Sequence, residues 1–154
     1  MTESVFVDTN VLVYRYDTSD PSKQARAETW YRHLWSRRCG RLSFQVLQEM
    51  YATLTRKLKP GLAAPQAQRI VRALKAWQPI AIDFAVLERA WNLQEGHALS
   101  WWDALIVAAA QLGACRALLT EGMQHGQVFG AVRVIDPFAS SDRTPPEVLQ
   151  APGS

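Results

Sequence analysis

The chain has 154 residues, a formal net charge of +3, 48% hydrophobic residues and 20% charged residues, which is typical of one globular domain and excludes a disordered chain. Its longest apolar run, Ala104–Ala110, is far shorter than the ~20 residues that a membrane-spanning helix needs. Two cysteines are too few for a disulfide framework or a four-thiolate zinc site, so we expect a reduced, cytoplasmic protein.

Strands and helices are predicted to alternate along the chain. Apolar runs without polar alternation predict buried strands, and capping residues together with Gly or Pro bound the helices. The predicted strands are 5–7, 80–82, 117–120 and 132–135, and the predicted helices are 11–16, 21–38, 44–58, 65–77, 84–95 and 101–112. Strands separated by helices predict an α/β fold, a three-layer α/β/α sandwich with a central parallel sheet of roughly 4–5 strands. We predict that this domain spans residues 1–138 and that residues 139–154, rich in Pro and Ser, form a flexible tail.

Positive charge is concentrated in the first half of the chain. Residues 1–75 hold 13 Lys and Arg against 6 Asp and Glu. Clusters such as Arg37-Arg38 and Arg56-Lys57 either grip phosphates or an acidic partner, or simply solvate the ends of helices.

Asp8 is the strongest candidate for a functional-site residue, because it directly follows the first buried strand. Loops at the carboxyl ends of parallel strands build the site in this class of fold. The same position also suits a helix N-cap. Thr9 and Asn10 either cap this turn or hold the aspartate by hydrogen bonds.

Two further carboxylates are open to two interpretations each. Asp103 follows Ser100 at the spacing of a capping box, and Glu49 lies off the apolar stripe of its helix, where most glutamates are solvated. If these acids meet Asp8 at the sheet edge, with little His or Cys nearby, the site suits Mg²⁺ or Mn²⁺ rather than zinc. Such an ion activates water and stabilises charge on a phosphate.

Four blocks of the sequence, in this order, resemble PIN-domain ribonucleases, and most of all the toxins of VapBC-type toxin–antitoxin modules: VFVDTNVLVY, SFQVLQEMYATLTRK, LSWWDALIVAAA and LLTEGMQHGQVFGAVRVIDPF. The resemblance runs from about residue 4 to 138. It implies a Mg²⁺- or Mn²⁺-dependent endoribonuclease that hydrolyses RNA with a metal-activated water. Asp8 and Asp103 would be metal ligands, and Glu49 a third acid that binds metal or orients water. A homodimer and a cognate antitoxin are implied as well.

One position departs from the family pattern. The family usually has Ser/Thr-Glu-Asp after the penultimate strand, whereas this chain has Thr120-Glu121-Gly122. Neighbouring side chains of an extended segment point to opposite faces, so Glu121 either misses the cluster or is redirected by its loop. Thr120 either bonds a neighbouring carboxylate or ends its strand. Loss of an acid leaves an alternative open, a catalytically weakened RNA- or antitoxin-binding protein.

Trp101 and Trp102 flank Asp103, and they either stack on bases or pack in the core. Other α/β classes fit less well. A phosphoaspartyl phosphatase needs an acid where Asn10 stands, a receiver needs paired acids near the first strand, and no phosphate-binding Gly-x-x-x-x-Gly-Lys loop is present.

Overall fold

Five strands form one sheet in the computed structural model, which describes residues 3–151: β1 (Val5–Val7), β2 (Gly40–Arg41), β3 (Ala117–Leu119), β4 (Val128–Phe129) and β5 (Val132–Ile135). Their order is β2-β1-β3-β5-β4. The β4 strand pairs antiparallel with β5, and the other neighbours are parallel. In this register Phe6 of β1 lies between Arg41 and Leu118. The predicted central sheet is therefore confirmed as mostly parallel, with one antiparallel edge strand.

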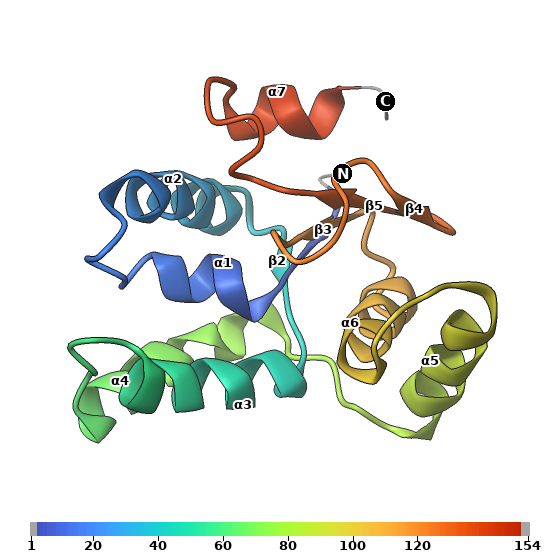
Figure 1. The fold of residues 1–154 in the computed structure, drawn as a ribbon, viewed down its shortest axis with the longest axis horizontal. Helices are drawn as coiled ribbons and strands as arrows, with labels where there is room; N and C mark the ends of the chain where they lie inside the picture. Colours follow the sequence, from blue (N-terminus) through green and yellow to red (C-terminus); the bar gives the residue numbers. More distant parts are fainter. Residues whose placement is uncertain (1–2, 152–154) are drawn as a thin grey trace.

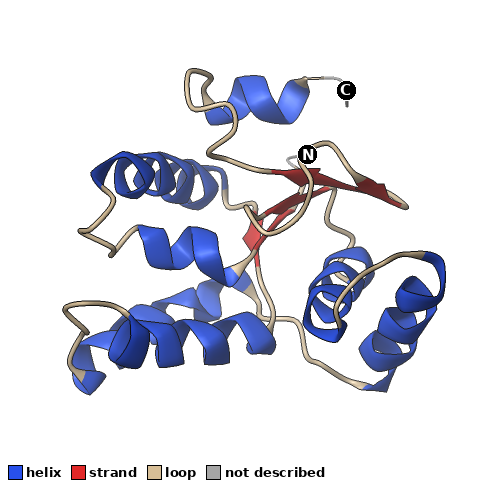
Figure 2. Ribbon diagram, viewed as in Figure 1, coloured by secondary structure: helices blue, strands red, loops and turns tan. Residues whose placement is uncertain are grey.

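Helices cover both faces of this sheet, as Figures 1 and 2 show. They are α1 (Thr9–Tyr14), α2 (Pro21–Arg37), α3 (Phe44–Ala52), α4 (Ala64–Ala73), α5 (Phe84–Gly96), α6 (Trp101–Leu112) and α7 (Pro145–Gln150), with a π-helical turn η1 (Thr53–Lys57) after α3 and a 3₁₀ turn η2 (Leu74–Trp77) after α4. The α2 and α7 helices lie on one side of the sheet and α5 and α6 on the other. This arrangement confirms the three-layer α/β/α fold.

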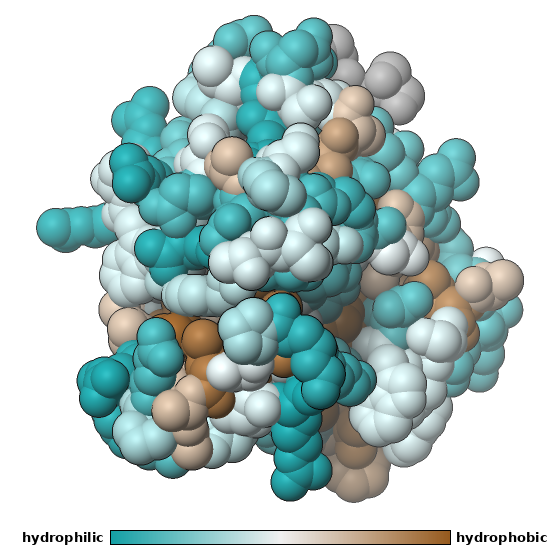
Figure 3. Space-filling model, turned by 60° about the vertical axis from the view of Figure 1, so that its left-hand side comes forward, coloured by the Kyte–Doolittle hydropathy of each residue, from teal (hydrophilic) through white to brown (hydrophobic). Residues whose placement is uncertain are grey.

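The core forms where strands without polar residues meet the apolar face of α6. Every residue of β1 and β3 is buried, and so is the α6 run Ala104–Ala110, which packs on β3 and β5. Figure 3 shows that the outer face it displays is mostly hydrophilic, with hydrophobic residues gathered in the hollows of its lower half. Among the described residues, no helix has both the length and the apolar character required to cross a membrane.

The predicted strand 80–82 is wrong. Only Ile80 forms an isolated parallel bridge, to Ser43, and the chain then turns into α5, which Asp83 caps. The strand at that edge of the sheet is instead β2, which apolar patterning missed because it contains Gly40. A Cβ at Gly40 would lie 2.9 Å from ring atoms of Trp77, so only glycine allows this close approach.

The segment 139–151 differs from the predicted flexible tail. It contains α7, in which Thr144 caps the first turn and Val148 is buried. The buried Arg26 donates from Nε to the Pro137 carbonyl at 2.7 Å and from Nη2 to the Ser140 carbonyl at 2.7 Å, which ties the start of this segment to α2. Composition alone missed these long-range contacts. Residues 152–154 of the predicted tail lie outside the described residues.

Candidate active site

Asp8 lies at the carboxyl end of β1 and caps the N-terminus of α1. Its Oδ1 accepts a hydrogen bond from the Thr9 backbone N at 2.8 Å, and its Oδ2 accepts from Thr120 Oγ1 at 2.9 Å and from Asn10 Nδ2 at 3.5 Å. Asp8 also lines a cavity at the carboxyl end of this strand, the edge at which sites form in parallel α/β folds. Asp8 is therefore both a helix cap and part of the lining of this cavity.

Burial dominates the electrostatics of Asp8. The pKa of its carboxyl is raised from 3.8 to about 6: loss of solvent is the largest cause, and the negative charges of Glu49 and Asp103 act in the same direction. Hydrogen bonds from Thr120 and the Thr9 backbone act in the opposite direction. Without a bound cation, ionisation of Asp8 therefore costs free energy, and a nearby cation would offset that cost.

The three predicted acids line one cavity of about 510 Å³. Asp8 comes from the β1–α1 junction, Glu49 from α3 and Asp103 from α6, so residues far apart in the chain are brought together. Asp17 adds a fourth carboxylate, and Lys57 is the sole cation among the described residues that line the cavity. The cavity is therefore strongly acidic, although the chain as a whole is basic.

Glu49 is fixed from both sides. Gln45, one helical turn earlier, donates from Nε2 to Glu49 Oε1 at 2.8 Å, and Thr9 donates from Oγ1 to Glu49 Oε2 at 3.4 Å. The same Gln45 amide lies 3.4 Å from the carbonyl oxygen of Trp102. Its Oε1 is buried and has no hydrogen-bond donor among the described residues, which adds an unneutralised acceptor beside the acids.

Asp103 sits in the first turn of α6, where its backbone N donates to Ser100 Oγ at 3.1 Å. The predicted helix start is thus correct, and the half-buried carboxyl also lines the cavity. Partial burial raises the pKa of Asp103, and a hydrogen bond from Ser100 opposes this shift.

Thr120 and Asn10 both donate hydrogen bonds to Asp8, and of the two only Asn10 lines the cavity. The Thr120 hydroxyl, fully buried, donates to Asp8 and accepts from Asn10 Nδ2 at 3.2 Å and from the Gly122 backbone N at 3.0 Å. A Cβ at Gly122 would lie 3.5 Å from Thr120 Oγ1 and 3.9 Å from Asn10 Nδ2, which are ordinary contacts. The position at which the family usually has an acid is therefore next to this network and has room for a side chain.

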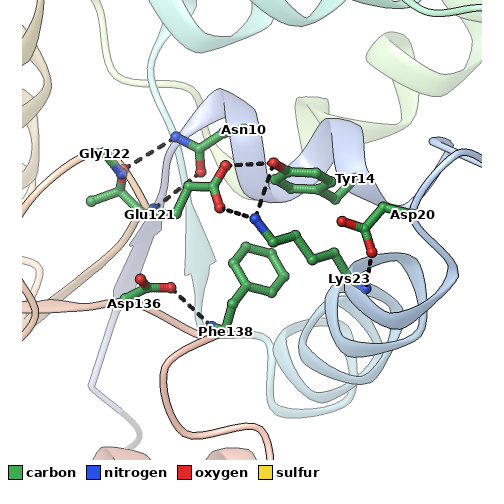
Figure 4. A network of polar contacts seen from close by, with 9 residues as sticks. Asn10, Tyr14, Asp20, Lys23, Glu121, Gly122, Asp136 and Phe138 are labelled. Carbon is green, nitrogen blue, oxygen red and sulfur yellow. Dashed lines mark hydrogen bonds and ion pairs between the residues drawn. The ribbon is translucent and has the colours of Figure 1, made fainter.

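Glu121 points toward Tyr14 and Lys23, as Figure 4 shows. Its Oε2 pairs with Lys23 Nζ at 2.7 Å, and its Oε1 accepts from the Tyr14 hydroxyl at 2.6 Å. Its backbone N donates to Asn10 Oδ1 at 3.3 Å. Glu121 does not line the cavity, in keeping with the alternating directions expected of an extended segment.

Sequence reasoning did not single out Asp17 or Gln45. Asp17 has no helical or strand pattern to mark it, whereas Gln45 could have been found from its four-residue spacing to Glu49. Lys57 was part of a basic cluster whose role stayed open. The two tryptophans lie in different environments: Trp101 packs against the core, and Trp102 is exposed and lines the cavity.

The donor set fits a hard divalent cation. Among the described residues no three His, Cys, Asp or Glu side chains already form a metal-binding cluster. Mg²⁺ nevertheless keeps several waters and is commonly held by one or two carboxylates plus substrate phosphate. The described lining offers carboxylates, the two amides of Asn10 and Gln45, and hydroxyls, but neither His nor Cys, which suits Mg²⁺ or Mn²⁺ better than zinc.

Comparison with known proteins gives a family and a fold. The family model described as "PIN domain" matches residues 5–128. A toxin–antitoxin complex from Klebsiella pneumoniae is similar with a TM-score of 0.63 and 23% identity, over 87% of this chain and 98% of that chain. VapBC2 from Rickettsia felis, solved bound to a DNA fragment from its promoter, is similar with a TM-score of 0.52 and 18% identity, over 84% and 96%. No curated protein matched the chain.

Proposed function

This chain belongs to the PIN-domain family, and we propose that it is a Mg²⁺- or Mn²⁺-dependent endoribonuclease that acts as the toxin of a toxin–antitoxin pair. The observation that carries the proposal is the meeting of Asp8, Glu49 and Asp103 in one acidic cavity at the carboxyl end of β1. Three carboxylates that line one cavity repel each other and also repel the phosphate of a substrate. Phosphate binding at this site would therefore need a cation.

Each residue has a distinct part in the proposed reaction. Asp8 and Asp103 would hold the divalent ion, and Glu49, oriented by Gln45 and Thr9, would bind metal or orient the attacking water. The hydrogen bond that Thr120 donates to Oδ2 lowers the pKa of Asp8 and so favours its ionised form, against the effect of burial. A bound divalent ion would supply an activated water and stabilise the charge that develops on the phosphate.

Proposed partners follow from the same kinship. The two similar structures are toxin–antitoxin assemblies by their descriptions, and we propose that this chain likewise forms a homodimer inhibited by a cognate antitoxin in the cytoplasm. Exposed basic residues such as Arg56 and Lys59 suit either RNA phosphates or an acidic antitoxin segment.

Cleavage of a mixed RNA substrate with Mn²⁺, with Mg²⁺ and with EDTA tests the proposal. We expect cleavage only with metal, and its loss in Asp8→Ala and Asp103→Ala. Glu88→Ala, which removes an exposed acid on α5 away from the cavity, is the matched control and should cleave like the parent. Unchanged cleavage in both aspartate variants would reveal a contaminating nuclease and overturn the proposal.

A second candidate rests on Gly122. With the usual fourth acid missing, the protein would bind RNA or antitoxin and cleave weakly or not at all. The two candidates differ in one measurement. If the parent binds RNA in the presence of metal without cleaving it and Gly122→Asp cleaves, the weakened reading is correct.

A further inference from the structure

Trp102 is an exposed aromatic side chain inside the candidate active site. It is 64% exposed and lines the same cavity as Asp8, Glu49 and Asp103. Large aromatic residues are normally buried, since exposing an indole to water forfeits much of its favourable burial. An exposed tryptophan at this place therefore requires an explanation that packing does not give.

Its neighbour Trp101 shows what packing looks like in this helix. The Trp101 ring stacks on Trp91 of α5, with ring centroids 5.9 Å apart and 24° between planes, and packs against the core. Trp102 has no such aromatic partner among the described residues. Trp101 thus anchors the start of α6, and the face of Trp102 is left available.

The backbone beneath Trp102 is held firmly. It lies in the first turn of α6, which Ser100 caps, and its carbonyl oxygen faces the Gln45 amide that also holds Glu49. The next residue is Asp103, whose carboxyl lines the cavity. Trp102 is therefore positioned beside the acids rather than on a loose loop.

Charge alone does not draw a polyanion into this cavity. Its described lining carries four carboxylates, Asp8, Asp17, Glu49 and Asp103, against the single ammonium of Lys57. Stacking of a nucleobase on an aromatic ring does not depend on net charge and tolerates any base. It can therefore supply binding where the electrostatic contribution is unfavourable.

We propose that Trp102 is a substrate-positioning residue that stacks on an unpaired nucleobase of the RNA substrate, next to the scissile phosphate. The inference rests on the proposed nuclease function and deepens it. Bases in a duplex are stacked on each other, and only a splayed base presents its face to a side chain. A nucleobase is favoured over a protein partner because the ring shares its cavity with the three acids of the proposed nuclease reaction.

Binding of a fluorescent single-stranded RNA, and of the same RNA annealed to its complement, tests this role. All proteins carry Asp8→Asn, so that the RNA survives, and all measurements use the same Mg²⁺-containing buffer. We expect Trp102→Leu to weaken single-strand binding roughly 5- to 150-fold, the range measured for loss of one base–aromatic stack. Trp102→Phe should recover much of the loss, because it restores a ring. Phe84→Ala, which removes an aromatic that is 67% exposed on α5 outside the cavity, should bind like the background protein.

Two further readouts separate stacking from a merely structural role. A single abasic nucleotide at the cleavage position should weaken binding to the background protein but not to the Trp102→Leu variant, since the stack is already lost. In proteins with Asp8 intact, Trp102→Leu should raise KM more than it lowers kcat. The thermal midpoint should stay near that of the parent because the side chain is exposed.

The outcomes distinguish this inference from the function on which it rests. If the parent neither binds nor cleaves RNA, both proposals fail. If the parent cleaves RNA and Trp102→Leu binds single strands as tightly as the background protein, only the stacking role fails. If RNA binding is unchanged while self-association measured by sedimentation is lost in Trp102→Leu, the residue belongs to a protein interface and the inference is overturned.

Discussion

Replacing Asp8 by asparagine should stabilise the apo protein while it removes the proposed activity. Burial keeps the pKa of this carboxyl at about 6 in the folded protein, against 3.8 when the chain is unfolded. The folded state therefore binds the proton more tightly, and stability falls as pH rises from about 4 to above 6. Asparagine has nearly the same shape and no charge, so it avoids this loss.

The size of the effect follows from the pKa. The rise of the Asp8 pKa from 3.8 to about 6 corresponds to about 3 kcal/mol of unfolding free energy lost by the parent at pH 7. Asparagine forgoes part of the hydrogen bonding from Thr120 and the Thr9 backbone, which costs about 1 kcal/mol. We expect a net gain of about 2 kcal/mol, or roughly 4–8 °C in Tm.

Urea unfolding of both proteins in EDTA, at several pH values between 4 and 7, measures this difference. The advantage of Asp8→Asn should shrink by about 2 kcal/mol between pH 7 and pH 4, where the parent carboxyl is protonated. Mg²⁺ should stabilise the parent and leave the variant unchanged. Asp17→Asn is the matched control: it removes a charge from the same cavity at a less buried position and should give no such gain. A variant that is less stable at pH 7, or an advantage independent of pH, would refute the reasoning.

Three further variants test the surroundings of Asp8. Gly122→Asp should fold normally, since its Cβ meets only ordinary contacts, and should tighten Mn²⁺ binding in a calorimetric titration; no gain in affinity or cleavage would mean that the missing acid is not limiting. Thr120→Val should lower the unfolding free energy by about 1–3 kcal/mol and weaken metal binding, because the buried hydrogen-bond donor to Asp8 is lost. A metal affinity of the variant equal to that of the parent at pH 7 would contradict this. Glu121→Gln should cost less than about 1 kcal/mol in urea unfolding, since its ion pair with Lys23 is partly exposed, and should cleave RNA at the parent rate; a large loss of activity would return Glu121 to the site.

The local parts of this fold are readable from the sequence. The helices predicted to begin at residues 21, 44, 84 and 101 begin there, because a capping side chain bonds backbone groups only a few residues away. The caps are Asp20, Ser43, Asp83 and Ser100. The buried strands 5–7 and 132–135 appear at their predicted bounds, since continuous apolar runs suit a sheet covered on both faces.

What the sequence by itself determined is therefore which residues form each element and which face of it is apolar. Only the tertiary structure decided that Glu49, an exposed residue on the polar side of its helix, lines the same cavity as Asp8, and that Glu121 pairs with Lys23. It also separated Trp101, which packs, from Trp102, which stands open beside Asp103. The physical reason is that periodicity fixes a side chain's direction relative to its own element, whereas its neighbours depend on how elements distant in the chain pack against each other.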